Sequence, residues 1–568
     1  MFSLVKKMKL HKIKIALCII YLITPLILIK LNPIIFLATN DDGIFVSILE
    51  SNFEFIGKNN LIYTSMIYGN FIKFFYVFSP YLQWHGIFLL LTALVSLLYF
   101  TYEILKLEID RFLKLIIIFM IYIQYIYMIF APNFSSAALN VGLIGTLLFY
   151  LSIFLNKNIK NIIFILLIIS YLIRPDGFIF ILYVILPGVF YLTFKNIKTK
   201  KIKRIIDLRW LVIIFLVGID LFYRNFLTSK SYTWNEYYKF INLFHQVDTN
   251  PSMLKMHQKI ASFQIPGLSW SNVEATLLHQ IAYFDSAVFN SASLKLAVES
   301  VHEFLGLSGL VNADFYSTLI RIWQYMYSVN YLFYACLTVF VILIILFYKN
   351  KFIILIIFSW LYMFFIFYFL GAVWRIPLRI LLPILFSFLL FLILISFIFV
   401  QTSKIKIIIT MTSLALFTFF HLNQFGLKGT LEKSSIRIKE YKSLQESYQS
   451  LGSAVIFIGQ IKYLDENYTN AYVRNNDLNT LHISSGWHTF SPYWLNNLNN
   501  LKIQKNPLFS VANQSNVYWV SDKYISEVID MYMNDRKIKR QEKCKIKDLG
   551  INNGAIYSFS KKGEICLK

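Results

Sequence analysis

The chain has 568 residues, of which 57% are hydrophobic, with a mean hydropathy of +0.59 and a formal net charge of +24. Soluble globular chains are only about 45–50% apolar, so this composition excludes an ordinary soluble protein and predicts one that is largely embedded in lipid. The positive charge would suit nucleic acid, but much of the Lys and Arg falls in short connections between apolar stretches, where cations set membrane orientation. We therefore expect no nucleic-acid partner.

Eleven apolar stretches have about the length of a membrane-spanning helix, and we expect each to cross the membrane. They cover residues 15–37, 84–100, 115–131, 136–155, 162–173, 178–194, 210–226, 331–348, 352–371, 378–400 and 406–424. The basic N-terminus is expected to stay in the cytoplasm, and every even-numbered connection, which would share its side, is basic. The connection at residues 195–209 carries seven Lys or Arg against the single Asp207.

This orientation leaves three polar regions outside, at residues 38–83, 228–330 and 426–568. The fold class is therefore an all-α polytopic membrane protein: residues 1–425 form the transmembrane module and residues 426–568 a small extracytoplasmic α+β domain. In that domain, helical stretches alternate with strand-like ones; the helices are expected at 432–451 and 521–540, the strands at 454–459, 516–520 and 555–559. Cys544 and Cys566 lie there and could pair in an oxidising compartment.

Two adjacent carboxylates, Asp41 and Asp42, follow the first expected span. At the membrane surface either could act as a general base that deprotonates an acceptor hydroxyl. Alternatively, Asn40 or Asp41 caps an amphipathic helix over residues 43–55, and the two interpretations are compatible. A second amphipathic stretch spans residues 61–78, and we expect both helices to lie in the membrane interface plane.

An acidic pair directly after the first span, interfacial helices behind it, many spans and an outer C-terminal domain resemble the GT-C superfamily of polyprenyl-phosphate-dependent glycosyltransferases. Within it the chain is most similar to bacterial surface-polysaccharide enzymes, including O-antigen glucosyltransferases of the serotype-conversion kind. The organisation matches along most of the chain, whereas the residue-level match is confined to residues 40–42 and scattered Arg and Pro positions. The resemblance implies a bacterial inner-membrane enzyme with Asp41 or Asp42 as base, a polyprenyl-phosphate-hexose donor and a lipid-linked glycan acceptor.

One departure from these relatives concerns the second outer loop, which reads Ala-Pro-Asn-Phe-Ser-Ser at residues 131–136 where many of them carry a further acid. A bound divalent cation is therefore not supported, and the donor phosphate would need protein cations. Arg174, Arg375 and Arg379 lie at the outer boundary, where the charge rule disfavours them, and a guanidinium suits a phosphodiester. The alternatives are a local pair of Arg174 with Asp176 and snorkelling of Arg375 and Arg379 to headgroups.

Other polar and aromatic residues carry weaker signals. Asp220 lies within a span, where a carboxylate suggests function, although an ion pair with Arg224 four residues later explains it more simply. Trp487 and His488 could contact the sugar acceptor, or they could pack in the ordinary way. Neither a GxxxxGK[ST] nor a GxGxxG motif occurs, so a nucleotide donor or ATP-driven transport has no support.

The sequence therefore predicts a membrane hexosyltransferase that needs no cofactor. Two other functions stay open: an O-antigen or capsule polysaccharide polymerase, and a non-enzymatic lipid-linked oligosaccharide translocator. The polymerase would need no acidic pair after the first span. The translocator would not need over a third of its chain outside the membrane.

Overall fold

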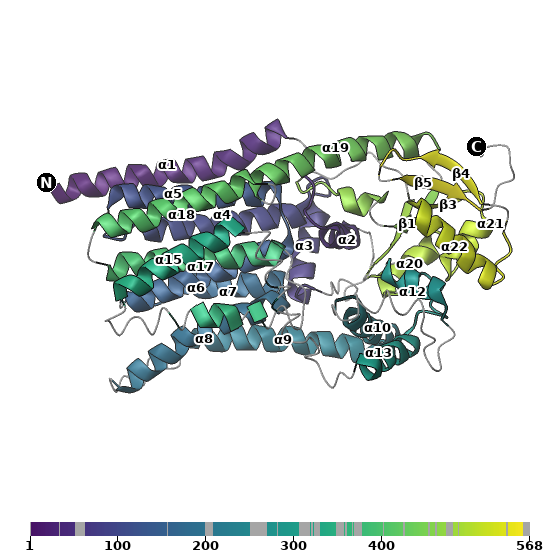
Figure 1. The fold of residues 1–568 in the computed structure, drawn as a ribbon, viewed down its shortest axis with the longest axis horizontal. Coiled ribbons are helices and arrows are strands. Elements are labelled where there is room, and N and C mark those ends of the chain that lie inside the picture. Colours follow the sequence, from purple (N-terminus) through teal and green to yellow (C-terminus); the bar gives the residue numbers. More distant parts are fainter. Residues whose placement is uncertain are drawn as a thin grey trace.

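A bundle of long helices carries a small β-sheet region at one end in the computed structural model (Figure 1). The structure describes residues 2–32, 34–50, 63–108, 110–155, 157–198, 208–249, 270–280, 282–305, 319, 322, 330–347, 357, 360–365, 367–368, 378–400, 403–423, 426–451, 455–460, 463–472, 481–486, 488–540, 543–551 and 553–559. The N-terminal helix starts at the end of the bundle that lies farthest from the sheet (Figure 1).

Five helical runs of the described chain are long and apolar enough to cross a membrane. Four are single helices, namely α4 (Trp84–Leu105), α5 (Arg111–Phe130), α6 (Phe134–Phe154) and α17 (Leu378–Phe399). The fifth, Lys404–Gln449, comprises α18 (Ser403–Leu422) and α19 (Leu427–Gln449). A helical membrane protein is therefore confirmed at this coarse level.

Further helices coincide with other expected spans. They are α1 (Phe2–Leu31), α7 (Asn161–Ile173), α8 (Pro175–Lys198), α9 (Leu208–Lys230) and α15 (Asn330–Phe347). The 13 residues of α7 reach only about 20 Å, as its short apolar stretch predicts. The span expected at residues 352–371 lies largely outside the described residues.

Helix α6 forms the centre of the bundle and packs against α4, α7, α8 and α17. Small side chains permit this close packing, as they do at other helix interfaces in lipid. A Cβ added at Gly142 would lie 2.6 Å from Ser170 Oγ and 2.8 Å from an Ile181 side-chain carbon. The core of the bundle therefore depends on glycine at this position.

The sheet has the strand order β2-β1-β3-β5-β4. Its strands are β1 (Ile456–Gln460), β2 (Leu481–Ser485), β3 (Val517–Asp522), β4 (Cys544–Asp548) and β5 (Gly554–Ser558). Strand β1 is parallel to both β2 and β3, whereas β5 is antiparallel to both β3 and β4. The strand-like stretches at 454–459, 516–520 and 555–559 correspond to β1, β3 and β5, while β2 and β4 were not predicted.

Helices of the C-terminal region and of the second outer region surround the sheet. The C-terminal ones are α20 (Pro492–Asn500), α21 (Pro507–Asn513) and α22 (Lys523–Asp535); the others are α10 (Tyr232–Thr249), α12 (Asn272–His279) and α13 (Ser291–Leu305). Arg536 donates to Glu274 at 2.7 Å, and the Tyr532 hydroxyl donates to Asp285 at 2.9 Å. These contacts join residues 228–330 to the C-terminal region.

Candidate active site

The acidic pair lies at the start of α2 (Asn40–Glu50), close to where the bundle meets the sheet region (Figure 1). Thr39 caps this helix, because its Oγ1 accepts from the Asp42 N–H at 3.3 Å and its hydroxyl donates to Asp42 Oδ2 at 2.5 Å. The expectation that Asn40 or Asp41 is the cap is therefore wrong. The cap turns the Asp42 side chain back toward its own helix start.

Helix α2 is buried rather than interfacial. Ile44 and Phe45 are at most 1% exposed, and Leu49 is equally enclosed, because both the bundle and the C-terminal region pack around the helix. The expectation of an amphipathic helix lying free in the interface plane fails for α2, which ends at Glu50. Residues 51–62, the end of that expected helix included, lie outside the described residues.

The next helix, α3 (Met66–Phe78), fits the interfacial expectation better, since Phe71, Phe74 and Phe78 are 45%, 57% and 70% exposed. Its buried side meets the bundle. Asp220 of α9 anchors its first turn by accepting from Ser65 Oγ at 2.8 Å and from the Met66 N–H at 2.9 Å.

The expected pair of Asp220 with Arg224 is present, but its atoms are 4.0 Å apart. Tyr171 is a closer partner, because its hydroxyl donates to Asp220 at 2.9 Å. The Asp220 carboxylate therefore holds α3 in place.

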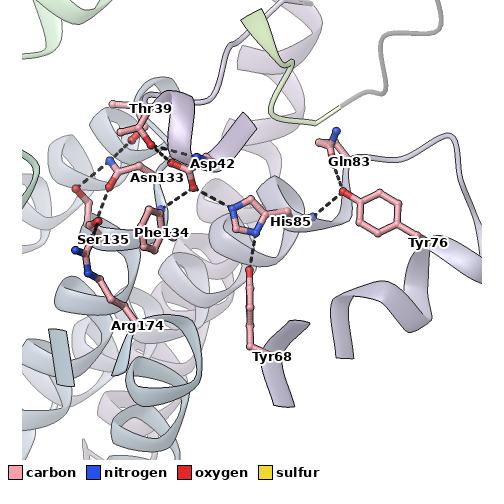
Figure 2. Close-up of polar contacts among 12 residues, drawn as sticks. Thr39, Asp42, Tyr68, Tyr76, Gln83, His85, Asn133, Phe134, Ser135 and Arg174 are labelled. Atoms are coloured by element: carbon pink, nitrogen blue, oxygen red, sulfur yellow. Dashed lines mark hydrogen bonds and ion pairs between the residues drawn. The ribbon is translucent and has the colours of Figure 1, made fainter. Parts of the chain in front are cut away.

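Asp42 is fully buried and connects three helices (Figure 2). Besides the Thr39 hydroxyl, it accepts from His85 Nε2 at 2.9 Å and from the Phe134 backbone N–H at 3.0 Å. His85 starts α4 and Phe134 starts α6, so one carboxylate fixes the relative positions of α2, α4 and α6. A buried carboxylate with three donors suits a structural role better than proton transfer with a substrate.

His85 extends this network to α3 (Figure 2). Its Nδ1 lies 2.8 Å from the Tyr68 hydroxyl. Because the Asp42 carboxylate can only accept, Nε2 carries the proton that is shared with it. The sequence reasoning missed His85 and Tyr68, although a histidine at the boundary of an expected span is a signal that could have identified the first of them.

Asp41 has a different environment from its neighbour. Its side chain is 18% exposed, and Oδ2 lies 3.4 Å from a guanidinium nitrogen of Arg379, itself 25% exposed. Arg379 is near the start of α17, and its backbone carbonyl accepts from Ser136 Oγ at 2.8 Å. The structure thus brings together two residues that are 338 positions apart in the chain.

Arg174 joins the same cluster from the turn between α7 and α8. Its guanidinium donates to Ser135 Oγ and lies 4.8 Å from the centre of the Phe134 ring. Burial lowers the pKa of Arg174 from its ordinary value, and the charge of Asp176 opposes that shift. Its partner Ser135 is adjacent to Ser136, which bonds to the backbone of Arg379, so Arg174 lies close to the pair of Arg379 and Asp41.

Residues 131–136, where the resemblance led us to note the lack of an acid, contribute other groups. Asn133 caps α6 and Ser136 bonds to α17, while Phe134 and Ser135 contact the acidic pair and Arg174 as described. Among the residues that the structure describes, no three or more His, Cys, Asp or Glu side chains are grouped so as to hold a metal ion.

The other expected site residues are Arg375, Trp487 and His488. Arg375 and Trp487 lie outside the described residues. His488 is 9% exposed and lies within 3.3 Å of Ser484 Oγ. Burial lowers the pKa of His488 to about 4, so the ring is neutral at pH 7. Contact of Trp487 and His488 with an acceptor stays a prediction, and the burial of His488 does not favour it.

The C-terminal region braces the segment that leads to Asp41. Ala471 N–H donates to the Ile35 carbonyl at 2.7 Å, and Leu37 N–H donates to the Thr469 carbonyl at 2.9 Å. A Cβ added at Gly86 would lie 1.8 Å from the Ala471 carbonyl oxygen, so glycine is required where the start of α4 meets this C-terminal segment. Proper placement of Asp41 therefore depends on residues more than 400 positions further along the chain.

Comparisons of this chain with protein-family models, with curated proteins and with solved structures each find no match.

Proposed function

We propose that the protein is a GT-C-type glycosyltransferase that moves a hexose, with glucose as the first candidate, from a polyprenyl phosphate to a lipid-linked surface glycan such as O-antigen. The observation that carries this proposal is the cluster of Asp41, Arg379 and Arg174. One partly exposed carboxylate pairs with Arg379, and Arg174 lies nearby on Ser135, at one end of the helical bundle.

Each group of the cluster has a role in this proposal. Arg379 and Arg174 hold the donor phosphate and stabilise the negative charge that develops on it as the bond to the sugar breaks. Asp41 accepts the proton of the acceptor hydroxyl as its oxygen attacks the anomeric carbon. Asp42 positions α2 and takes no part in the chemistry.

The contact between Arg379 and Asp41 suits a reaction in which the donor binds before Asp41 acts as the base. At 3.4 Å between partly exposed groups it is a long and weak ion pair. A donor phosphate that binds Arg379 competes with Asp41 for the same guanidinium. Binding of the donor would therefore release the base at the moment when it is needed.

The reaction is proposed to take place on the periplasmic side of a bacterial inner membrane, with eleven spans and a cytoplasmic N-terminus. The basic even-numbered connections support this orientation. The sheet region lies at the opposite end of the bundle from the start of α1 (Figure 1). Cys544 of that region is disulfide-bonded, which fits an oxidising compartment, whereas Cys18 and Cys336 in the bundle are free.

The exposed aromatic face of α3 gives the donor a route from the lipid. Phe71, Phe74 and Phe78 would lie at the membrane interface, where aromatic side chains gather. The same helix reaches the acidic pair through the bond between Tyr68 and His85. A polyprenyl chain in the outer leaflet could thus stay in lipid while its phosphate enters the cluster.

The test is a transfer assay with the purified full-length chain in vesicles that contain radiolabelled polyprenyl-phosphate glucose and a lipid-linked glycan. We expect one labelled hexose to be added to each acceptor. A ladder of extended glycans would instead indicate a polymerase, and label that crosses the membrane without bond formation would indicate a translocator. Either result would overturn the proposal.

A further inference from the structure

A second cluster of charged residues lies at the opposite end of the bundle, where α4 and α6 end and α7 begins. A cleft there is lined by Tyr99 and Glu103 of α4, Leu151 of α6, and Lys157 and Lys160 of the connection to α7. The cleft has a volume of about 20 Å³, room for about one water-sized group, and it opens to the surface.

The charges around this cleft do not balance. Lys160 Nζ and Lys106 Nζ lie 2.7 and 3.2 Å from the same oxygen of Glu103, Oε1. The two lysine side chains are 42% and 31% exposed, whereas Glu103 is only 12% exposed. Two ammonium groups thus share one carboxylate, and the exposed Lys157 adds a third positive charge to the rim of the cleft. An additional anion would bring this cluster closer to neutrality.

The aromatic rings nearby hold the cations in place. Lys106 Nζ lies 3.6 Å from the centre of the Tyr102 ring, and Lys160 Nζ lies 5.7 Å from that of Tyr99. Such contacts between cations and ring faces restrict long, flexible side chains. The ammonium groups are therefore positioned before a ligand arrives.

We propose that this cleft binds the phosphate group of an anionic phospholipid. A lipid is favoured over a soluble anion because the cleft lies at the last turn of α4 and α6, which are long enough to cross the membrane. Its walls also include apolar side chains, among them Leu107, Leu148 and Ile163, against which an acyl chain can pack. Basic pockets between helices at this depth are suited to anionic headgroups.

Glu103 determines how tightly this site holds its lipid. In the absence of a ligand, its carboxylate orients both Lys106 and Lys160. A phosphate must share these two cations with Glu103, so the carboxylate weakens lipid binding while it organises the site. Substitutions of the lysines and of the glutamate should therefore act in opposite directions.

The experiment uses the full-length protein in nanodiscs of phosphatidylcholine with a small fraction of phosphatidylglycerol, and native mass spectrometry measures the phosphatidylglycerol retained. We expect Lys106→Gln and Lys160→Gln each to lower retention about fivefold, the equivalent of about 1 kcal/mol per cation near a membrane surface. Glu103→Gln should raise it. The matched control is Lys404→Gln at the start of α18, which removes a charge at the same end of the bundle and should change nothing.

Three outcomes would overturn the assignment. The first is that neither lysine substitution changes the amount of phosphatidylglycerol retained. The second is that Glu103→Gln lowers this amount, as the lysine substitutions are expected to do. Alternatively, millimolar inorganic phosphate could displace the lipid completely, which would identify the site as one for a soluble anion. If one lysine variant fails to fold, the other lysine variant and Glu103→Gln still test the proposal with opposite signs.

Discussion

The two halves of the acidic pair have opposite environments although they are neighbours in the chain. Asp42 is fully buried and accepts from three donors, whereas Asp41 is 18% exposed and pairs with Arg379. Successive residues of a helix point about 100° apart, which directs one carboxylate into the protein and the other toward the cluster. Chemically identical side chains thus have different surroundings because of where the helix directs them.

The largest effect is expected from Asp41→Asn. Loss of a general base should lower the rate of transfer by about 10²–10⁴-fold, measured with the radiolabelled donor. Thermal stability should barely change, because the side chain is partly exposed and its pair with Arg379 is long. A variant that keeps wild-type activity would show that Asp41 is not the base.

Arg379→Gln tests the other side of the cluster. Removing one charged donor from a developing anion should lower the rate by about 10²–10³-fold. The matched control is Arg209→Gln, which removes a guanidinium at the far end of the bundle, where it bonds to the Ile159 carbonyl and Asn161. Equal losses in the two variants would contradict a specific role for Arg379.

Asp42→Asn should affect folding more than chemistry. The amide cannot accept from all three donors, and removing one partner of a buried pair costs about 3 kcal/mol. For a chain of this length, that corresponds to a fall in Tm of about 2–3 °C, measured by thermal unfolding in detergent. If Asp42→Asn is as stable as the wild type and loses activity as completely as Asp41→Asn, the roles of the two residues must be reassigned.

His488 belongs to the same buried surroundings as Asp42, because Gly486, two residues before it, lies next to Ile44 of α2. Because burial lowers the pKa of His488 from 6.5 to about 4, the unfolded chain takes up a proton before the folded one does. Stability should therefore fall as the pH drops from about 6.5 to about 4, by at most about 3 kcal/mol, and then level off. In His488→Gln this part of the pH dependence should disappear from unfolding curves; its persistence would exclude His488 as the cause.

Local pattern was enough to predict much of the fold. Apolar length predicted the long helices, and runs of buried β-branched and aromatic residues predicted β1, β3 and β5. Three of the five residues of β2, Leu-His-Ile-Ser-Ser, are polar, and three of the five of β4, Cys-Lys-Ile-Lys-Asp, are charged, as suits an edge strand. Both therefore lack the apolar run that marked the other strands. Each becomes a strand through pairing with its neighbour.

The candidate site was predictable only in part. Position relative to the spans identified Asp41, Arg174 and Arg379, which the structure brings together, while their roles remain predictions. Local sequence could not show that α2 would be buried, because the residues that cover it lie hundreds of positions away. The same holds for the bond from Phe134 to Asp42, since a backbone N–H leaves no trace in a sequence.

The bracing of residues 35–37 by residues 469–471 has a consequence for biosynthesis. Domains generally form in the order in which they leave the ribosome. Here the residue proposed as base emerges more than 400 residues before the segment that supports it. A nascent or truncated chain that lacks residues 469–471 would therefore lack this support for Asp41, and the proposed transfer would require that these residues have been made.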